Sequence, residues 1–456
     1  MKEGSLQKLR LAVVGAGPAG IYASDLILKA ERDFEVSIDL FDLLPAPYGL
    51  VRYGVAPDHP RIKGIIRALY EVLDRGDIRF FGNVEYGKDL TIEDLKQHYN
   101  AVIFATGAIA DADLNIPGIE LDGSYGAADF VNWYDAHPDF PMTWPLNAKE
   151  IAVIGNGNVA LDVARMLIKR PDDLLSTDIP DHVYQGLKAS PVTDVHVFGR
   201  RGPAQVKFSP LELREALHVE GVQSIVYDED FKYDEGSQAA IDSNNQVRVM
   251  VKTLEDLREN PQAHEDRRLH LHFFETPVEV TGEDGKVSGI KFQRTELDGT
   301  GNVKPVDEFK SYSVQAVYRA VGYFGSALPE VPFDSAKGVI SNTEGRVVDA
   351  SGNHIPGVYC TGWIKRGPVG LIGHTKADAI ETIGHVIADQ ASWWQPENPG
   401  EEQIVELLTS RSVPFIDWAD WLKLDSVERE LGEAEGRERK KLFDREQMLD
   451  LAKNRD

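Results

Sequence analysis

Short apolar runs recur along the chain, and glycine-rich turns and amphipathic segments follow them. Residues 11–14 form one such run, and residues 21–28 then carry apolar side chains at helical spacing. A short, continuous apolar run is typical of a strand that is buried on both faces of a parallel sheet. A further run over residues 36–41 completes a strand–helix–strand unit. The pattern therefore predicts an α/β protein.

The same pattern returns later in the chain. Strands are predicted over residues 151–154 and 195–198, and a helix is predicted over residues 159–167. Two later runs, 315–321 and 357–363, contain strands that end in glycine. We therefore expect two Rossmann-like dinucleotide-binding domains, the second of which is inserted into a discontinuous first domain.

The expected domain boundaries follow from these runs. The first domain is predicted over residues 1–107 and 326–456, and the inserted domain over residues 108–325. Within the inserted domain, the polar stretch 228–245 is predicted to be an exposed hairpin or loop. The tail from about residue 400 is predicted to be helical and highly charged, and its last 22 residues, including Arg437 to Lys441, to be solvated.

The first glycine-rich turn carries the fingerprint Gly15, Gly17 and Gly20. In a dinucleotide site these glycines allow a tight turn, a close approach of the pyrophosphate to the backbone, and close helix–strand packing. Asp42 lies 22 positions after Gly20, where a ribose-binding carboxylate is expected. An ordinary turn is the alternative, but the strand before the glycines and the helix after them favour a nucleotide site.

The second glycine-rich turn carries Gly155 and Gly157, with Ala160 as an accepted variant of the third glycine. Arg200 and Arg201 follow the strand over residues 195–198, where a site for NAD would place a carboxylate. Guanidinium groups suit a 2′-phosphate, so this turn is predicted to bind NADP. A solvated surface pair is the alternative. Two such sites in one chain indicate a flavin and a nicotinamide held face to face.

Composition limits the remaining classes of function. The 456 residues are enough for two or three domains, and the net charge of −25 argues against nucleic acid or an anionic membrane as partner. Lys2, Lys8 and Arg10 precede the first apolar run, as in a signal peptide, but the glycine fingerprint interrupts that run. We interpret it as the first strand of a cytoplasmic protein.

Cys360 is the single cysteine of the chain. An internal disulfide, a cysteine-ligated iron–sulfur cluster and a redox-active Cys-x-x-Cys pair are therefore excluded. The thiol is expected to be a small buried apolar side chain. Electrons would then leave the flavin directly for an outside acceptor, and no metal site is expected.

Five blocks of sequence support a family resemblance: residues 47–60, 155–165, 199–203, 212–215 and 362–368. Together they closely resemble the adrenodoxin reductase family, and in particular its bacterial NADPH–ferredoxin reductases. The likeness extends from about residue 9 to the final tail. It implies FAD at the first fingerprint and NADP(H) at the second.

The resemblance also implies individual contacts. The implied FAD contacts are the backbone near Ala19, Asp42, Leu50, Val84, Trp363, Gly370, Leu371 and Ile372. The implied NADP contacts are Asn156, Gly157, Asn158, Val159, Arg200, Arg201 and Glu212, with Gly370 near the nicotinamide. Two positions depart from the family pattern. Asp42 is shorter than the glutamate that is frequent there, and Ala112 replaces an arginine that helps to hold NADP.

His59 lies in the block that the family places beside the flavin, which makes it a candidate for proton or electron transfer. Glu215 and Asp162 are candidates to pair with it and to shift its pKa. The alternative for His59 is a loop residue or a structural hydrogen-bond donor. We expect all three to modulate the reaction, because flavin hydride chemistry belongs mainly to the cofactor.

The resemblance implies a ferredoxin–NADP⁺ reductase, in which hydride passes from NADPH to FAD and single electrons then pass to a ferredoxin-type iron–sulfur protein. The alternatives are an NADPH oxidoreductase with a small-molecule acceptor and a non-enzymatic flavin sensor. A monomer is expected rather than an oligomer. Docking of an acidic ferredoxin would need a local basic patch, for which the candidates are Arg52, Arg214, Arg258, Arg267, Arg268, Lys365 and Arg366.

Overall fold

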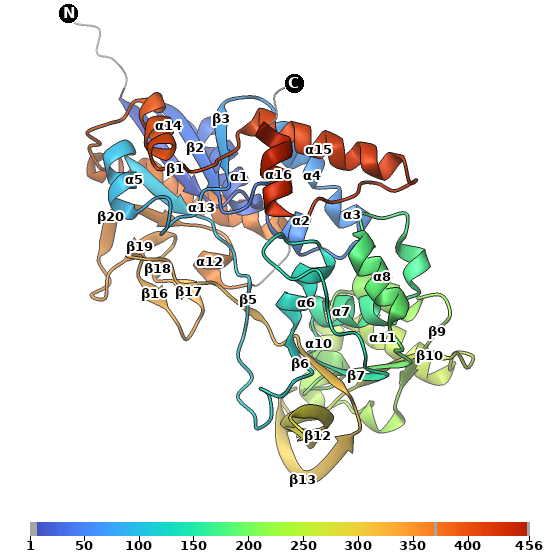
Figure 1. Cartoon of the computed structure of the whole chain (residues 1–456). Coiled ribbons are helices and arrows are strands. Elements are labelled where there is room, and N and C mark those ends of the chain that lie inside the picture. Colours follow the sequence, from blue (N-terminus) through green and yellow to red (C-terminus); the bar gives the residue numbers. More distant parts are fainter. Residues whose placement is uncertain (1–6, 369–371, 454–456) are drawn as a thin grey trace, which may run out of the picture.

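The computed structural model describes residues 7–368 and 372–453. Figure 1 shows two lobes, each with helices packed around a central sheet that is mainly parallel. We call the lobe with the larger sheet the first domain and the other the second domain. The order of the seven strands in the first domain is β18 (Asn342–Thr343), β19 (Arg346–Val348), β20 (His354–Cys360), β4 (Ala101–Phe104), β1 (Lys8–Val14), β2 (Glu35–Asp42) and β3 (Ile78–Gly82).

Helices cover both faces of this sheet because its central strands are apolar on both sides. On one face, Leu11 and Val13 pack under α1 (Pro18–Lys29), α4 (Ile66–Leu73) and α13 (Ile372–Ala388). On the other face, Ala12 and Val14 lie in the core that α5 (Ile92–His98) and α14 (Glu401–Ser410) complete. The remaining elements of this domain are α2 (Leu50–Tyr53), α3 (Pro60–Lys63), β16 (Phe333–Asp334), β17 (Val339–Ile340), α12 (Trp363–Arg366), the 3-10 turn Gln390–Ser392, α15 (Trp418–Glu433) and α16 (Arg445–Lys453).

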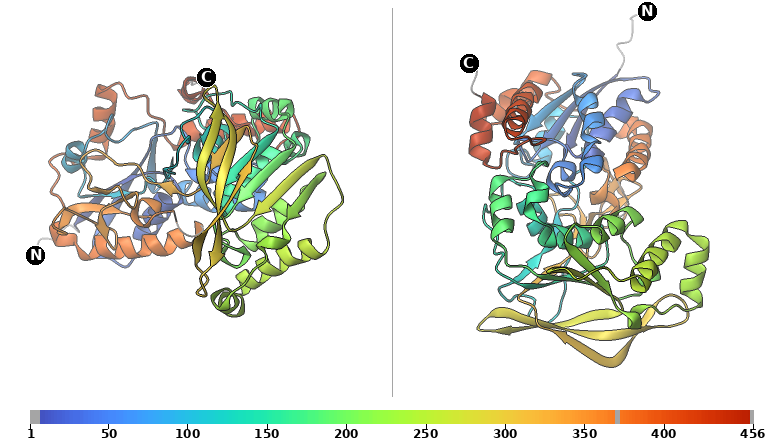
Figure 2. Two further views of the ribbon diagram at one scale, coloured as in Figure 1. Left: turned by 90° about the horizontal axis from the view of Figure 1, so that it is seen from below. Right: turned by 90° about the vertical axis from the view of Figure 1, so that its right-hand side faces the viewer.

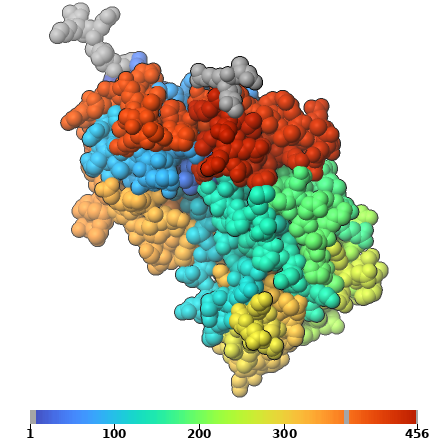
Figure 3. Space-filling model, viewed as in Figure 1, coloured from blue at the N-terminus to red at the C-terminus, as the bar shows by residue number. Residues whose placement is uncertain are grey.

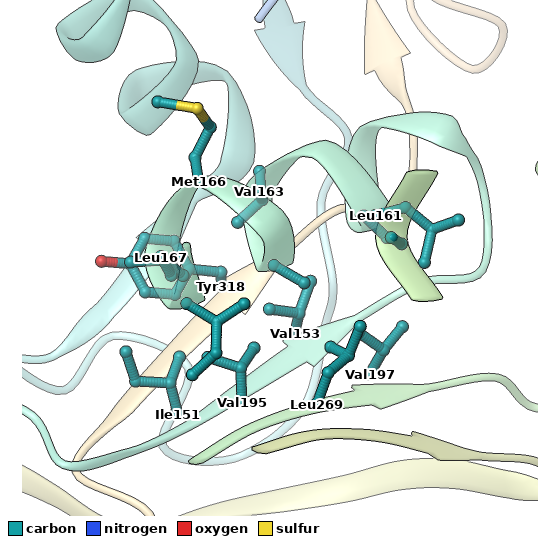
Figure 4. Close-up of a cluster of buried hydrophobic side chains, with 14 of the residues drawn as sticks. Ile151, Val153, Leu161, Val163, Met166, Leu167, Val195, Val197, Leu269 and Tyr318 are labelled. Atoms are coloured by element: carbon teal, nitrogen blue, oxygen red, sulfur yellow. The ribbon is translucent and has the colours of Figure 1, made fainter. Parts of the chain in front are cut away.

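The second domain is built on a six-stranded sheet. Its strand order is β6 (Ser124–Gly126), β14 (Ala316–Arg319), β7 (Glu150–Ile154), β8 (Asp194–Phe198), β10 (Arg267–His272) and β9 (Val222–Val226). Figure 4 shows Leu161, Val163 and Leu167 packed over this sheet, in one buried cluster with Ile151 and Val153 of β7 and Tyr318 of β14. The helices and 3-10 turns of the domain are α6 (Ala127–Tyr134), α7 (Asn158–Ile168), Pro171–Leu174, α8 (Asp181–Ala189), Pro203–Gln205, α9 (Pro210–Leu217), Asp228–Asp230, α10 (Glu235–Ser243) and α11 (Asn245–Glu259).

A separate antiparallel sheet covers the opposite face of the second domain. It comprises β11 (Glu275–Glu283), β12 (Lys286–Leu297) and β13 (Val303–Tyr312), which are drawn in yellow and gold in Figure 2. Ile290 and Phe292 from this sheet share a core with Ile154 and Phe198 of the large sheet. The antiparallel sheet therefore buries the face that the helices leave open.

Two short strands carry the chain between the domains. Strand β5 (Ala110–Asp111) leaves the first domain and pairs in antiparallel fashion with β15 (Tyr323–Phe324), which returns to it. After the return, β20 takes its place beside β4 in the first sheet. The expected α/β fold, with one dinucleotide-binding domain inserted into another, is confirmed.

The prediction of an exposed hairpin or loop over residues 228–245 is wrong. Helix α10 lies in this stretch, and α11 follows it directly. Asp234 caps α10 by accepting a hydrogen bond from the Ser237 amide, and Asn244 caps α11 in the same way through the Gln246 amide. Asp and Asn are frequent both in turns and at helix N-termini, and here they begin helices.

The prediction of a solvated tail is also wrong. The side chain of Lys441 is 1% exposed and bonds to Asp135, and that of Arg439 bonds to Asp425 and Glu428. Figure 3 shows the C-terminal residues, in red, lying over parts of both domains. Charge along a sequence indicates solvent exposure only when the partner charges are not supplied by distant segments.

Across the described ranges no helix is both long enough and apolar enough to cross a membrane.

Candidate functional site

The first glycine turn joins β1 to α1, and two of its three glycines are required by the fold itself. Gly15 has a φ of +111°, and a Cβ atom there would lie 2.4 Å from the Ala105 carbonyl oxygen. A Cβ atom on Gly20 would lie 1.9 Å from the Gly15 oxygen. Gly17 is different, because a Cβ atom there would meet nothing closer than Gly49 Cα at 3.8 Å. Gly17 therefore borders open space beside the N-terminus of α1.

The start of α1 is suited to an anion. Pro18 at the first position has no N–H, and no side chain of the described residues caps this N-terminus, so the Ala19 and Gly20 amides remain available. The loop over residues 47–50 lies against the turn, since the Tyr48 amide donates to the Ala16 carbonyl at 2.8 Å. Leu50 begins α2 in this loop and is half-buried. These features form a cradle that a phosphate group can enter.

Trp363 lies beside the same turn. It begins α12, and Gly362 before it approaches Ala19 so closely that a Cβ atom on Gly362 would lie 2.6 Å from the Ala19 Cβ atom. The indole is half-buried. Gly370 and Leu371 lie outside the described residues, and Ile372 is described only as the first residue of α13.

Asp42 ends β2 and turns its carboxylate toward the glycine turn. Its two oxygens accept hydrogen bonds from the Ala16 amide at 2.6 Å and the Leu44 amide at 2.9 Å. Burial raises the pKa of Asp42 to about 6, although these two amides and the Arg445 guanidinium oppose the rise. The side chain of Val84 is buried and its amide donates to the Asp42 carbonyl at 2.8 Å, so Val84 supports the loop of the acid.

The second glycine turn repeats this geometry between β7 and α7. Gly155 has a φ of +142°, and a Cβ atom there would lie 2.2 Å from the Ala320 oxygen. A Cβ atom on Gly157 would meet no atom within 4 Å. Ala160 is fully buried, which agrees with its place as the third, packing position of the fingerprint. The middle position of each turn is therefore a glycine that the fold of the chain does not itself require.

Two asparagines fix the surroundings of the second turn. The Asn158 side chain accepts a hydrogen bond from the Ser209 amide at 2.8 Å, and the Asn156 carbonyl accepts one from the Lys207 amide at 2.9 Å. The side chain of Asn156 also lies against Gly199. Val159 is half-buried in the first turn of α7. These residues thus hold the loop after β8 and the start of α9 beside the glycine turn.

Arg200 and Arg201 lie on the loop after β8, at the edge of this second turn. Their carbonyls are anchored, because the Thr295 hydroxyl donates to the Arg200 oxygen at 2.8 Å and the Phe274 amide donates to the Arg201 oxygen at 3.3 Å. In the described part of the chain, neither guanidinium has a carboxylate within 4.0 Å, in a protein whose net charge is −25. The backbone is held while both side chains remain available to an anion.

The structure brings His59, Asp162 and Glu215 together, with Glu212 beside them. The Nε2 atom of His59 lies 2.8 Å from Asp162 and 3.0 Å from Glu212, and its Nδ1 atom lies 2.9 Å from Glu215. His59 belongs to the first domain and the three carboxylates to the second. Burial alone would lower the pKa of His59, but its hydrogen bonds to Asp162 and Glu212 raise it to about 10. The imidazole is therefore protonated at neutral pH.

A second ionic contact lies directly beside His59. Arg165 makes a bidentate pair with Asp58 at 2.9 and 3.0 Å, and Lys169 approaches the same carboxylate at 3.1 Å. The pKa of Asp58 is lowered because these cations outweigh the effect of burial. Sequence reasoning did not select these three residues. The signal was present, because Asp162, Arg165 and Lys169 follow one another at helical spacing.

The predicted basic patch is only partly available. Arg52 and Lys365 are buried and are paired with Glu428 and Asp378, so the prediction that they could meet a docking partner is wrong. Arg267 donates to the backbone carbonyls of residues 168 and 169, and Arg268 is paired with Asp194. Arg258 and Arg366 lie beside Glu259 and Asp378. Arg214 is exposed and has no salt bridge in the described structure.

Ala112 lies where the inserted domain begins, and its amide donates to the Gly322 carbonyl at 2.8 Å. The neighbouring Asp111 accepts hydrogen bonds from the Ala128 amide at the start of α6. The crossing between the domains is thus fixed by the Ala112 amide and the Asp111 carboxylate, and the methyl group of Ala112 supplies no charge to it.

Comparison with known proteins gave consistent matches. The family model described as pyridine nucleotide-disulphide oxidoreductase matches residues 9–189. The mitochondrial NADPH:adrenodoxin oxidoreductase of Arabidopsis thaliana is 37% identical, with 99% of this chain and 96% of the relative covered. The NADPH-ferredoxin reductase FprA of Mycobacterium tuberculosis is 39% identical, with 96% and 98% covered. The structure of Mycobacterium tuberculosis FprA in complex with NADPH superposes with a TM-score of 0.90 at 38% identity, covering 98% of this chain and all of that one.

Proposed function

The chain belongs to the family of NADPH:adrenodoxin oxidoreductases and NADPH-ferredoxin reductases, and on that premise we propose that it carries electrons from NADPH through FAD to a ferredoxin-type iron–sulfur protein. One observation supports this most strongly. Both glycine turns have an open middle position, but among the described residues only the second has beside it a pair of arginines without acidic partners. The two turns therefore suit two different nucleotides.

The first turn fits FAD. The space beside Gly17, the free amides of α1 and the inward-facing carboxylate of Asp42 match the pyrophosphate and ribose of a dinucleotide. When bound there, FAD supplies the conversion of a two-electron hydride transfer into single-electron transfers. Ala19, Leu50 and Trp363 would contact it, and Gly370, Leu371 and Ile372 are proposed from the family resemblance alone.

The second turn fits NADP(H). Gly157 would admit the pyrophosphate, and Arg200 and Arg201 would bind the 2′-phosphate. Asn156, Asn158 and Val159 would line the nucleotide. Glu212 is 4% exposed and already contacts His59, so its contact with NADP would be indirect.

His59, Asp162 and Glu215 are proposed to hold the two domains in register and to keep the imidazole positively charged at their junction. The imidazole is fixed through both nitrogens, and its raised pKa keeps it protonated. A group held in this way positions its neighbours and stabilises negative charge nearby. It does not readily exchange its proton near neutral pH.

Further parts of the proposal rest on the same observations. The boundaries near residues 107 and 326 are proposed because β5 and β15 are the paired crossing strands. Cytoplasmic location and a monomeric state stay predictions. A flavin sensor would have no use for the arginine pair. A small-molecule acceptor remains the alternative to a ferredoxin.

Anaerobic stopped-flow mixing with NADPH tests the proposed function. We expect a yellow protein that is bleached by NADPH, only slowly by NADH, and reoxidised by a ferredoxin. A colourless protein, or one that NADPH does not bleach, would refute it. Reoxidation by quinones but by no ferredoxin would favour the small-molecule alternative.

A further inference from the structure

The loop that carries Asp42 is bonded to a second loop, over residues 82–84. The Val84 amide donates to the Asp42 carbonyl at 2.8 Å, and the Asn83 amide donates to the Leu44 carbonyl at 3.0 Å. Asn83 has a φ of +61°, an uncommon conformation for a residue other than glycine. The position of the Asp42 carboxylate therefore depends on contacts between two short loops.

Arg445, the first residue of α16, joins these loops from outside. Its Nη1 atom donates to the Leu43 carbonyl at 2.9 Å and to the Asn83 side-chain oxygen at 2.5 Å. One guanidinium group thus bonds to both loops. Its charge also lies close enough to Asp42 to lower the pKa of that carboxylate, in opposition to the effect of burial.

The same guanidinium reaches the second domain. Its Nε and Nη2 atoms donate to the carboxylate of Asp139, at 3.0 Å and 2.7 Å. Asp139 lies between α6 and β7, in the sequence of the inserted domain. The guanidinium group is planar, and it bonds to a carboxylate on one edge and to two loop oxygens on the other. These bonds fix its orientation.

We propose that Arg445 is a positioning residue of the FAD site, which holds the Asp42 loop in place and ties it to Asp139 of the second domain. This inference rests on the proposed binding of FAD at the first turn. Within the described residues Arg445 makes no hydrogen bond to the glycine turn itself, and it acts through Leu43 and Asn83. The C-terminal segment thus becomes part of the flavin site.

The test is the affinity for FAD of Arg445→Gln, Arg445→Lys and Asp139→Asn, measured by flavin fluorescence when FAD is added to protein stripped of flavin. Loss of a charge-assisted fork is expected to weaken FAD binding about tenfold in Arg445→Gln. Arg445→Lys should recover part of this loss, since it keeps the charge but not the fork. Asp139→Asn should show a smaller loss, because the bonds to Leu43 and Asn83 remain.

A matched control is Arg437→Gln. Arg437 also ties the C-terminal segment to the second domain, through Asp181 at 2.8 Å, but in the described part of the chain it has no hydrogen bond or ion pair with the Asp42 loop. Its FAD affinity should stay within about twofold of wild type. Equal losses in Arg437→Gln and Arg445→Gln would overturn the inference, as would wild-type affinity in Arg445→Gln.

The pH dependence of FAD affinity gives a second readout. A variant that merely loosened the C-terminal segment would not change it. The groups facing Asp42 are the Ala16 and Leu44 amides, the Arg445 guanidinium and the Tyr53 hydroxyl. Without the Arg445 charge, FAD affinity should begin to fall at a higher pH than in wild type. An unchanged profile would count against the inference. If wild-type protein itself binds no FAD, the proposed function fails first, and the two failures are thereby distinguished.

Discussion

The two glycine turns have nearly the same backbone but opposite chemistry at the end of the neighbouring strand. After β2, Asp42 points inward and is already bonded to the Ala16 and Leu44 amides. After β8, Arg200 and Arg201 are anchored through their carbonyls, and among the described residues their guanidinium groups have no acidic partner. A ribose offers neutral hydroxyls, which can donate hydrogen bonds to a fixed carboxylate. A phosphate is negatively charged and binds instead to guanidinium groups that have no other ionic partner. We therefore propose that the glycine turn makes the nucleotide site and that the residues at the end of the following strand determine which nucleotide binds.

The largest effect should come from removing the selecting charges of the second turn. Replacing both Arg200 and Arg201 by Ala should weaken NADPH binding about 100-fold and leave NADH binding nearly unchanged. The measurement is the concentration dependence of flavin reduction by each nucleotide. Arg61→Ala, an exposed arginine on α3, is the control. If the double variant still preferred NADPH over NADH, Arg200 and Arg201 would not be the residues that recognise the 2′-phosphate.

A methyl group at the middle glycine tests the shared backbone. Gly157→Ala should weaken NADPH binding about tenfold without changing the unfolding midpoint, because the added Cβ meets no atom of the chain. Gly155→Ala should instead destabilise the fold, since its Cβ would lie 2.2 Å from the Ala320 oxygen. Urea unfolding and NADPH titration separate the two outcomes. If Gly157→Ala bound NADPH normally, the open space would not be the phosphate site.

The link between the domains should show in the pH dependence of stability. The pKa of His59 in the folded protein is about 10, above its usual value, so its stabilising effect is complete below about pH 6.5 and is lost as the pH rises through about 10. Because each tenfold change in proton affinity corresponds to about 1.4 kcal/mol, we expect this contribution to be on the order of a few kcal/mol. Urea unfolding of wild type and His59→Gln at pH 6.5 and pH 10 gives it by difference. Parallel pH profiles would show that the His59 cluster does not stabilise the domain contact.

The smallest effect should come from the support of the arginine loop. Thr295→Val removes the hydroxyl that donates to the Arg200 carbonyl at 2.8 Å, and should weaken NADPH binding about threefold. Thr253→Val, which removes a hydroxyl bonded within α11, is the matched control. Equal NADPH affinity in the two variants would show that the loop needs no support from β12.

Local sequence patterns were sufficient for the parts of the fold that are built from neighbours in the chain. The strands flanking Gly15 and Gly155 could be predicted because buried parallel strands and glycine turns each leave a short signature. The loop prediction over residues 228–245 was wrong because Asp and Asn, such as Asp234 and Asn244, occur both at helix N-termini and in turns. In such stretches only the packing of the segment decides between the two.

The ionic contacts could not be predicted from local pattern. Lys441 bonds to Asp135, which lies 306 residues earlier in the chain, and Arg445 bonds to Asp139 at the same separation. A charged tail that is solvated and one that is buried against distant carboxylates have the same composition. The pairing of His59 with Asp162 and Glu215 was foreseen only because the family resemblance placed His59 at the flavin.

The single cysteine has a practical consequence for measuring the distance between the two lobes. Cys360 is fully buried at the end of β20, and burial raises the pKa of its thiol, so it should resist labelling reagents in the native state. A cysteine introduced on the exposed surface of each lobe would then be modified selectively, without first removing a native thiol. Paired spin or fluorescent probes attached in this way would report whether the distance between the lobes changes during turnover.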